Sequence, residues 1–121
     1  MWLILLLSHI INNIQLITYN QQHMIVYTLT ANVDEDIADE WLLWMKDQVF
    51  AFMNQTQHVA EIKTFKVLND NEGVTYTFQF FFKDVFVYKL FLSEHHKNFS
   101  ILLSKYGHPK VAYFNTLLQQ V

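Results

Sequence analysis

The sequence predicts an α+β fold in which a four-stranded antiparallel sheet carries two helices on one face. Four stretches between residues 25 and 118 alternate apolar and polar side chains, which is typical of strands with one buried face. Two longer stretches repeat their apolar side chains at helical spacing, and each lies between two predicted strands. The resulting order, β-α-β-β-α-β, is the ferredoxin-like or split βαβ pattern.

Residues 25–33 are predicted to form the first strand. Its apolar face, which we expect to point into the core, consists of Ile25, Tyr27, Leu29, Ala31 and Val33. The first helix is predicted over residues 34–53, with Asp34 as its N-cap. The stripe of this helix that faces the sheet is expected to consist of Ile37, Trp41, Trp44, Met45, Gln48 and Phe52. We expect the two tryptophans to anchor the helix in the core.

Five carboxylates crowd the start of this helix, namely Asp34, Glu35, Asp36, Asp39 and Glu40. A divalent-cation site is one interpretation, but the spacing and the glycine of an EF-hand loop are missing. The helix dipole favours negative charge in the first turn and explains the cluster more simply. We therefore expect these carboxylates to complement the helix end.

Residues 58–68 and 74–82 are predicted to form a hairpin, because residues 69–73 are a cluster of turn formers. Glu61 and Lys63 indicate that the first of these strands is an exposed edge. In the second strand, the face expected to point into the core consists of Tyr76, Phe78, Phe80 and Phe82. The opposite face consists of Thr75, Thr77, Gln79 and Phe81.

The second helix is predicted to begin at its cap Asp84 and to end before Gly107, which occupies the position of a C′ glycine. Pro109 prevents the helix from continuing, and residues 110–118 are predicted to form the last strand. The stripe of this helix that faces the sheet is expected to consist of Tyr88, Phe91, Leu92, His95, Phe99, Leu102 and Tyr106.

Two helices on one face leave the other face of the predicted sheet bare. This bare face is expected to carry Val26, Thr28, Thr30, Thr75, Thr77, Gln79 and Phe81. It is half apolar, and a second copy packed sheet to sheet would cover it. We therefore predict a homodimer of the dimeric α+β barrel type, with a cavity between the sheets. The candidate ligand or dimer residues are Thr28, Thr30, Thr75, Thr77, Gln79 and Phe81.

Residues 1–23 differ in character from the rest of the chain. Residues 2–7 form an apolar run that is interrupted far short of the roughly 20 residues of a membrane span. A basic segment and a small-residue cleavage site, typical of a secretory signal, are also missing. We interpret residues 1–23 as an N-terminal extension outside the fold and residues 24–121 as a single domain. A cryptic signal or anchor and a structured extra element are the alternatives.

Composition excludes several classes of function. The 121 residues include no cysteine, which excludes disulfides, thiolate nucleophiles and zinc–thiolate sites and fits a reducing cytoplasm. All eight basic residues are lysine and the net charge is −3, so we expect no nucleic-acid partner. A membrane partner is not expected either. With only two glycines, a phosphate-binding or dinucleotide-binding loop cannot be written.

Histidines are the remaining candidates for chemistry. His58 and His108 flank strand starts and are expected to reach the end of the bare sheet face, where either could act as a base. His95 and His96 are neighbours on a helix, so their side chains point about 100° apart and neither has a histidine four residues away. We therefore predict that the protein binds no metal, and we expect no cofactor.

Six short motifs resemble a small bacterial family known only as a domain of unknown function, of the DUF4286 type. They are M-I-V-Y-T-L-T-A-N-V, E-W-L-L-W-M-K, G-V-T-Y-T-F-Q, K-Y-G, V-A-Y and T-L-L-Q-Q-V, all within residues 24–121. The resemblance implies the ferredoxin-like fold. It implies no particular activity, because the family has none assigned. Two departures stand out. Family members often have His-Ile-Pro where this chain has residues 49–51, and a basic residue where it has Phe114 and Asn115.

Three functions follow as hypotheses. The first is a cytoplasmic homodimer with no assigned activity, packed through the bare sheet face. The second is a cofactor-independent enzyme acting on a small molecule, monooxygenase-like or isomerase-like by analogy with the fold. A cavity of at least roughly 300 Å³ on which His58, Gln79 or Asn115 converge would favour this enzyme. The third, a membrane-anchored interaction domain, depends on residues 1–23.

Overall fold

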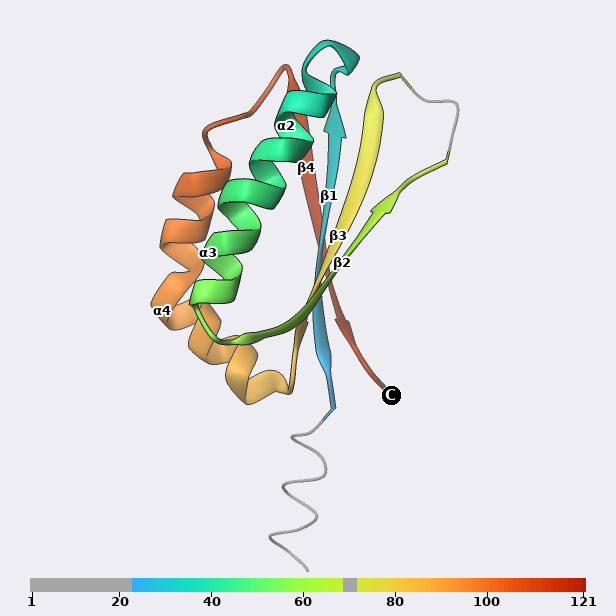
Figure 1. Ribbon diagram of the computed structural model, residues 1–121. Coiled ribbons are helices and arrows are strands. Elements are labelled where there is room, and N and C mark those ends of the chain that lie inside the picture. The colour runs from blue at the N-terminus through green and yellow to red at the C-terminus, as the bar shows by residue number, and fades with distance from the viewer. Residues whose placement is uncertain (1–22, 69–71) are drawn as a thin grey trace, which may run out of the picture.

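The computed structural model, which describes residues 23–68 and 72–121, confirms the predicted α+β architecture. Its four strands form one sheet in the order β2-β3-β1-β4, and every neighbouring pair is antiparallel. The strands are β1 (Ile25–Val33), β2 (Val59–Lys66), β3 (Val74–Phe82) and β4 (Val111–Gln119). As Figure 1 shows, all helices lie on one side of this sheet.

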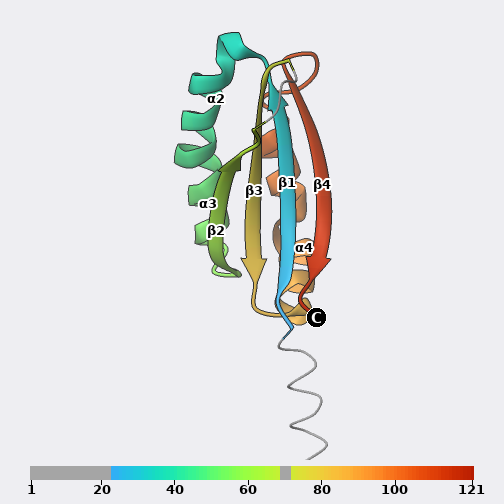
Figure 2. The same ribbon diagram turned by 90° about the vertical axis from the view of Figure 1, so that its right-hand side faces the viewer.

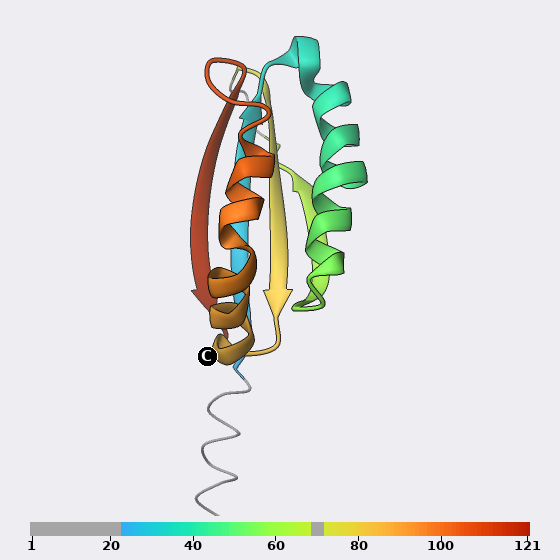
Figure 3. The same cartoon turned by 90° about the vertical axis from the view of Figure 1, so that its left-hand side faces the viewer.

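The two helical regions on this side cover different parts of the sheet. In Figure 3, α4 (Val85–Leu103) crosses in front of β1 and β4, whereas the helix that follows β1 lies nearer β2 and β3. Figure 2 shows the opposite face, on which no helix of residues 23–68 and 72–121 packs. The predicted bare face is therefore present in the folded chain.

Aromatic residues dominate the core between sheet and helices. The predicted alternation of both central strands is confirmed, with Leu29 of β1 and Phe78 of β3 paired in register and both fully buried. Trp41 packs its ring against Phe78 at 5.7 Å and is also fully buried, as its predicted anchoring role requires. The other large, fully buried side chains include Phe80, Phe82, Phe91, Phe99, Met45 and Met53.

The first helical region is not one regular α-helix. It consists of a 3-10 turn (Glu35–Ile37), α2 (Ala38–Trp44), a π-helical segment (Met45–Val49) and α3 (Phe50–Gln55). A π-helical turn holds more residues than an α-helical turn, so it rotates every later side chain around the axis. Val49 and Met53 are consequently buried, whereas Gln48 is exposed and Phe52 is half-buried. The predicted stripe was therefore wrong at Gln48 and missed Val49 and Met53, whereas Phe52 packs partly buried against the core as predicted.

The start of the first helical region differs from the prediction, whereas the start of α4 does not. Asp34 makes no side-chain capping bond; its carboxylate lies 3.4 Å from Lys110 Nζ, and Asp36 Oδ2 accepts a 2.7 Å hydrogen bond from the same ammonium. These two carboxylates therefore tie the start of the helical region to the start of β4. Asp84, in contrast, caps α4 as predicted, because its Oδ1 accepts a 2.9 Å bond from Val87 N.

The end of α4 and its stripe also need correction. The helix ends at Leu103, and Gly107 lacks the positive φ that a C′ glycine adopts. The Gly107 carbonyl instead accepts bonds of 3.0 Å from the backbone N–H of Lys110 and Val111, which closes the turn into β4. Leu92 is exposed because it lies about 100° around the helix from the buried Phe91.

Gly73 is the glycine on which the fold depends. Its φ is +77°, and a Cβ added there would lie 2.7 Å from the carbonyl oxygen of Val33. Only glycine fits this approach of the β2–β3 turn to the end of β1. Most of the predicted turn, residues 69–71, lies outside the described residues.

The predicted N-terminal extension, residues 1–23, also lies outside the described residues, apart from His23. Among the helices of residues 23–68 and 72–121, none is both long enough and apolar enough to cross a membrane.

Candidate functional site

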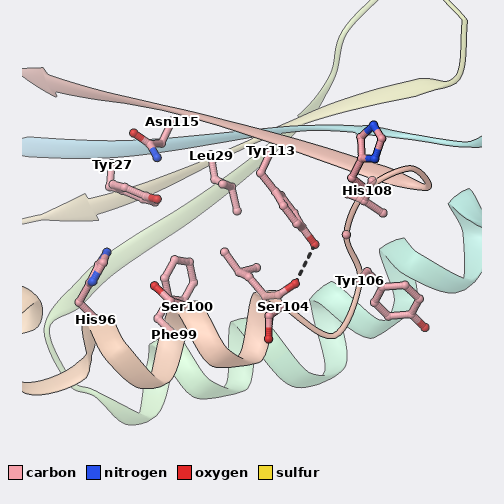
Figure 4. A pocket seen from close by; sticks show the side chains of 13 residues that line it. Tyr27, Leu29, His96, Phe99, Ser100, Ser104, Tyr106, His108, Tyr113 and Asn115 are labelled. Atoms are coloured by element: carbon pink, nitrogen blue, oxygen red, sulfur yellow. Dashed lines mark hydrogen bonds between the residues drawn. The ribbon is translucent and has the colours of Figure 1, made fainter.

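A groove of about 530 Å³ opens between α4 and the strands β1 and β4, on the helix-covered side of the sheet. It exists because the core-facing positions of β4 become steadily more polar and open along the strand. Val111 is buried, Tyr113 is half-buried and Asn115 is exposed. The helix and sheet therefore separate toward Asn115, and side chains from both line the space (Figure 4).

The groove has apolar walls and a few polar groups. Leu29 and Phe99 form part of the apolar wall, and the Tyr27 ring meets Phe99 edge to face at 6.1 Å. Figure 4 places the imidazoles of His96 and His108 at opposite ends of this space. The remaining polar groups are the hydroxyls of Ser100 and Ser104 and the amide of Asn115. An apolar cleft with a few polar groups is the usual form of a small-molecule site.

Two of the three tyrosines that line the groove, Tyr27 and Tyr113, are held in their neutral form. Burial raises the pKa of Tyr27 above 10.0, the nearby Tyr88 raises it further, and a hydrogen bond with Asn115 opposes both. Burial also raises the pKa of Tyr113. The hydroxyl of Tyr113 accepts from Trp41 Nε1 and donates to the Leu103 carbonyl, at 3.3 Å in each case. Tyr113 thus supports the structure, while Tyr27 keeps its phenol near Asn115 in the groove.

The six residues predicted for a ligand or dimer site share the bare face of the sheet. They are Thr28, Thr30, Thr75, Thr77, Gln79 and Phe81, and they alternate along β1 and β3 with the core residues. Thr30 and Thr77 are paired in register and share a 2.6 Å hydrogen bond between their hydroxyls. Thr75 Oγ1 accepts a 2.9 Å bond from Asn32 Nδ2. Three of the six side chains therefore take part in hydrogen bonds between β1 and β3.

Thr28 lies on the same face but forms no such hydrogen bond. It pairs in register with Gln79, yet its hydroxyl oxygen is buried and has no hydrogen-bond partner among the described residues. A buried hydroxyl without a partner is unfavourable by about 1–3 kcal/mol. Thr28 lies on β1, one of the two central strands.

The edge strands add apolar groups that the predicted site did not include. Phe65 of β2 pairs with Thr77, and Phe114 of β4 pairs with Thr30, so both rings lie on the bare face. Phe114 is 63% exposed, and Leu118 on the same strand is also exposed. Strict alternation along residues 110–118 would have revealed Phe114 and Leu118, once β4 was known to pair with β1.

His58 and His108 do not reach the bare face, so the predicted location was wrong. The loops that lead into β2 and β4 both come from helices, and they enter the sheet on the helix-covered side. His108 accordingly lines the groove, and His58 Nε2 lies 3.3 Å from Glu94 Oε2 of α4. Of the three residues whose convergence on a cavity would favour an enzyme, Asn115 lines the groove, whereas His58 does not line it and Gln79 faces the bare side. A catalytic role for either histidine stays a prediction.

Comparison with protein families gives a match over nearly the whole described chain. A family model described as "Domain of unknown function (DUF4286)" matches residues 24–121. A search of curated proteins gives no match.

Solved structures with the same fold are numerous but distant in sequence. A dimeric ferredoxin-like protein from an uncultured marine organism has 14% identity and a TM-score of 0.52, with 82% of this chain and 96% of that chain covered. SnoaB, a cofactor-independent oxygenase from Streptomyces nogalater, has 10% identity and a TM-score of 0.57, with 78% and 90% covered. A putative antibiotic biosynthesis monooxygenase from Bacillus cereus has 9% identity and a TM-score of 0.60, with 80% and 92% covered. At these identities the likeness shows the fold alone.

Proposed function

The chain belongs to the DUF4286 family, whose description states no activity, and from this premise we propose that it is a cytoplasmic homodimer packed through the bare face of its sheet. The absence of cysteine is consistent with a reducing cytoplasm. The similar protein from an uncultured marine organism is described as dimeric, which supports this assembly.

The exposed apolar groups of the bare face carry this proposal. Phe65, Phe114 and Leu118 are all exposed, because no helix in the described part of the chain covers the sheet surface on which they lie. Removing apolar surface from water contributes roughly 25 cal/mol per Å², so a partner that covers these groups is favoured. A two-fold dimer presents the same patch from both copies, so the face must be complementary to itself.

The oligomeric state tests this proposal. Phe114→Asp places a charge on the bare face, and a desolvated charge at an interface is strongly unfavourable. Light scattering after size exclusion should give twice the chain mass of 14.5 kDa for the natural sequence and the single mass for Phe114→Asp. Phe86→Asp is the matched control, since Phe86 is 61% exposed but lies on α4, away from the bare face. A monomeric natural protein, or equal dissociation by both variants, would contradict the dimer.

A second candidate function, an enzyme acting on a small molecule without a cofactor, is supported by the groove. Imidazoles of His96 and His108 and the neutral phenol of Tyr27 line one space of about 530 Å³. Histidine can accept or donate a proton near neutral pH, and the apolar wall suits a flat organic ring. The fold is shared with an oxygenase described as cofactor-independent. We place this candidate site in the groove instead of the cavity between two sheets.

Binding of an aromatic probe tests the groove. Titration with 2-naphthol, followed by NMR of the histidine side chains, should shift the ring signals of His96 and His108. Ser100→Trp should abolish these shifts, because Ser100 lines the groove and an indole would fill it. Ser93→Trp is the control, since Ser93 is an exposed serine of the same helix and does not line the groove. Shifts that persist in Ser100→Trp would show that the probe binds elsewhere.

A further inference from the structure

A second cluster of reactive side chains lies outside both the groove and the bare face. His58 immediately precedes β2, and Glu94 and His95 are consecutive residues of α4. Glu94 Oε2 lies 3.3 Å from His58 Nε2 and 3.6 Å from His95 Nε2. The two imidazole rings are 5.4 Å apart between their centroids. The fold therefore brings two imidazoles and one carboxylate together from segments that are distant in the sequence.

The spacing of these groups suits a metal ion. One ligand atom from each of the three residues lies within 4.8 Å of the other two. Metal–nitrogen bonds are about 2.0–2.1 Å long, so two ligand atoms on one ion lie about 3–3.5 Å apart. The distances from Glu94 to His58 and His95 are already close to this value, and a small rotation of side chains would bring the imidazole nitrogens within range.

The two histidines are held in place by their surroundings. The backbone N–H of His58 donates a 3.2 Å bond to Oγ1 of the buried Thr56. His95 packs edge to face against Phe52 of α3, with 6.3 Å between the ring centroids. Both imidazoles are partly buried, whereas the side chain of Glu94 is 54% exposed. An ion could thus approach from solvent on the Glu94 side and meet two positioned nitrogen ligands.

We propose that His58, Glu94 and His95 bind one divalent first-row transition-metal ion per chain. Two imidazoles and one carboxylate are a ligand set typical of zinc and of non-haem iron. Three protein ligands leave coordination positions open for water or for another molecule. The sequence pattern predicted no metal, because it considered only the neighbouring His95 and His96, whose side chains point about 100° apart on the helix. The partner that completes the site, His58, precedes the edge strand and is far away along the chain.

His96 provides an internal control for this site. It follows His95 directly on α4, but it lines the groove on the other side of the helix (Figure 4). A variant at His96 also removes one imidazole from α4, but it leaves the three proposed ligands in place. Any loss of affinity shared by the His95 and His96 variants would therefore reflect a different site or a general effect.

Calorimetric titration of the full chain with zinc sulfate tests the proposal. We expect one ion per chain for the natural sequence and an affinity at least tenfold lower for His58→Ala, His95→Ala and Glu94→Gln. His96→Ala should bind zinc as the natural sequence does. Cobalt(II) offers a second readout, because its visible absorption bands report the ligand set directly. These bands should appear for the natural sequence and for His96→Ala and weaken in the three ligand variants.

Several results would overturn the metal site. They are the absence of saturable binding, unchanged affinity in His58→Ala, or equal losses in His95→Ala and His96→Ala. Circular dichroism checks that each variant is folded. Glu94→Gln keeps the test usable if a histidine variant unfolds, because Glu94 is exposed. The site does not depend on the dimer, so Phe114→Asp should keep the zinc affinity of the natural sequence whether or not it dissociates.

Discussion

Trp41→Ala is expected to lower the free energy of unfolding by about 3–5 kcal/mol, the usual range for removing a buried indole. Trp41 is fully buried, and its ring lies 6.1 Å from that of Tyr76 and 5.7 Å from that of Phe78. Its Nε1 also donates to the Tyr113 hydroxyl at 3.3 Å. Alanine would leave a cavity between α2 and the sheet and would remove this donor. Small domains are stable by only about 5–15 kcal/mol, so the loss is a large fraction of the total.

Chemical denaturation followed by far-ultraviolet circular dichroism measures this loss. Leu43→Ala is the matched control, because Leu43 lies two residues further along α2 and is 69% exposed. It should change stability by no more than about 0.5 kcal/mol. Both variants must be compared at one protein concentration, since the midpoint of the proposed dimer would depend on concentration. A Trp41→Ala protein as stable as Leu43→Ala would contradict the packing of α2 against the sheet.

Phe99→Ala is expected to lower the free energy of unfolding by about 2–4 kcal/mol. Phe99 of α4 is buried and lies where sheet, first helical region and α4 meet. Its ring is within 6.3 Å of four others, those of Tyr27, Phe52, Phe80 and Phe91. The loss should be smaller than for Trp41, because Phe99 also lines the groove and water can enter the space that its ring leaves.

The same denaturation measurement applies to α4. Ile101→Ala is the control, since Ile101 follows two residues later on this helix and is 60% exposed. We expect Ile101→Ala to stay within about 0.5 kcal/mol of the natural sequence. Alanine has the highest helix propensity, so neither loss can come from propensity. Equal losses for Phe99→Ala and Ile101→Ala would therefore contradict the burial of Phe99 in the aromatic cluster.

The strands and their order were predictable because a strand has a fixed side-chain period. Alternation over residues 25–33 and 74–82 assigned every core-facing residue of β1 and β3 correctly. Trp41 and Trp44 were also placed in the core correctly. The bare sheet face followed from the order of elements alone, since two helices cover only one side.

Features that depend on contacts between distant segments were not predictable. The bond from Lys110 to Asp36 joins residues 74 positions apart, and nothing in the local pattern of either segment signals it. The cluster of His58 with Glu94 and His95 arises because the turn after α3 returns beside α4. The groove depends on how far α4 separates from β4, which is a matter of packing and not of period.

The π-helical segment has a consequence for aligning this chain with its relatives. A helix that is α-helical throughout needs one residue fewer to connect the buried Met45 with the buried Val49. An ungapped alignment across residues 45–49 would therefore equate each later residue of this helix with one that lies about 100° around the axis from it in such a relative. The same error would continue through α3 to Gln55. Residue correspondences between α2 and β2 should thus be drawn from buried positions, with a one-residue gap allowed inside the helix.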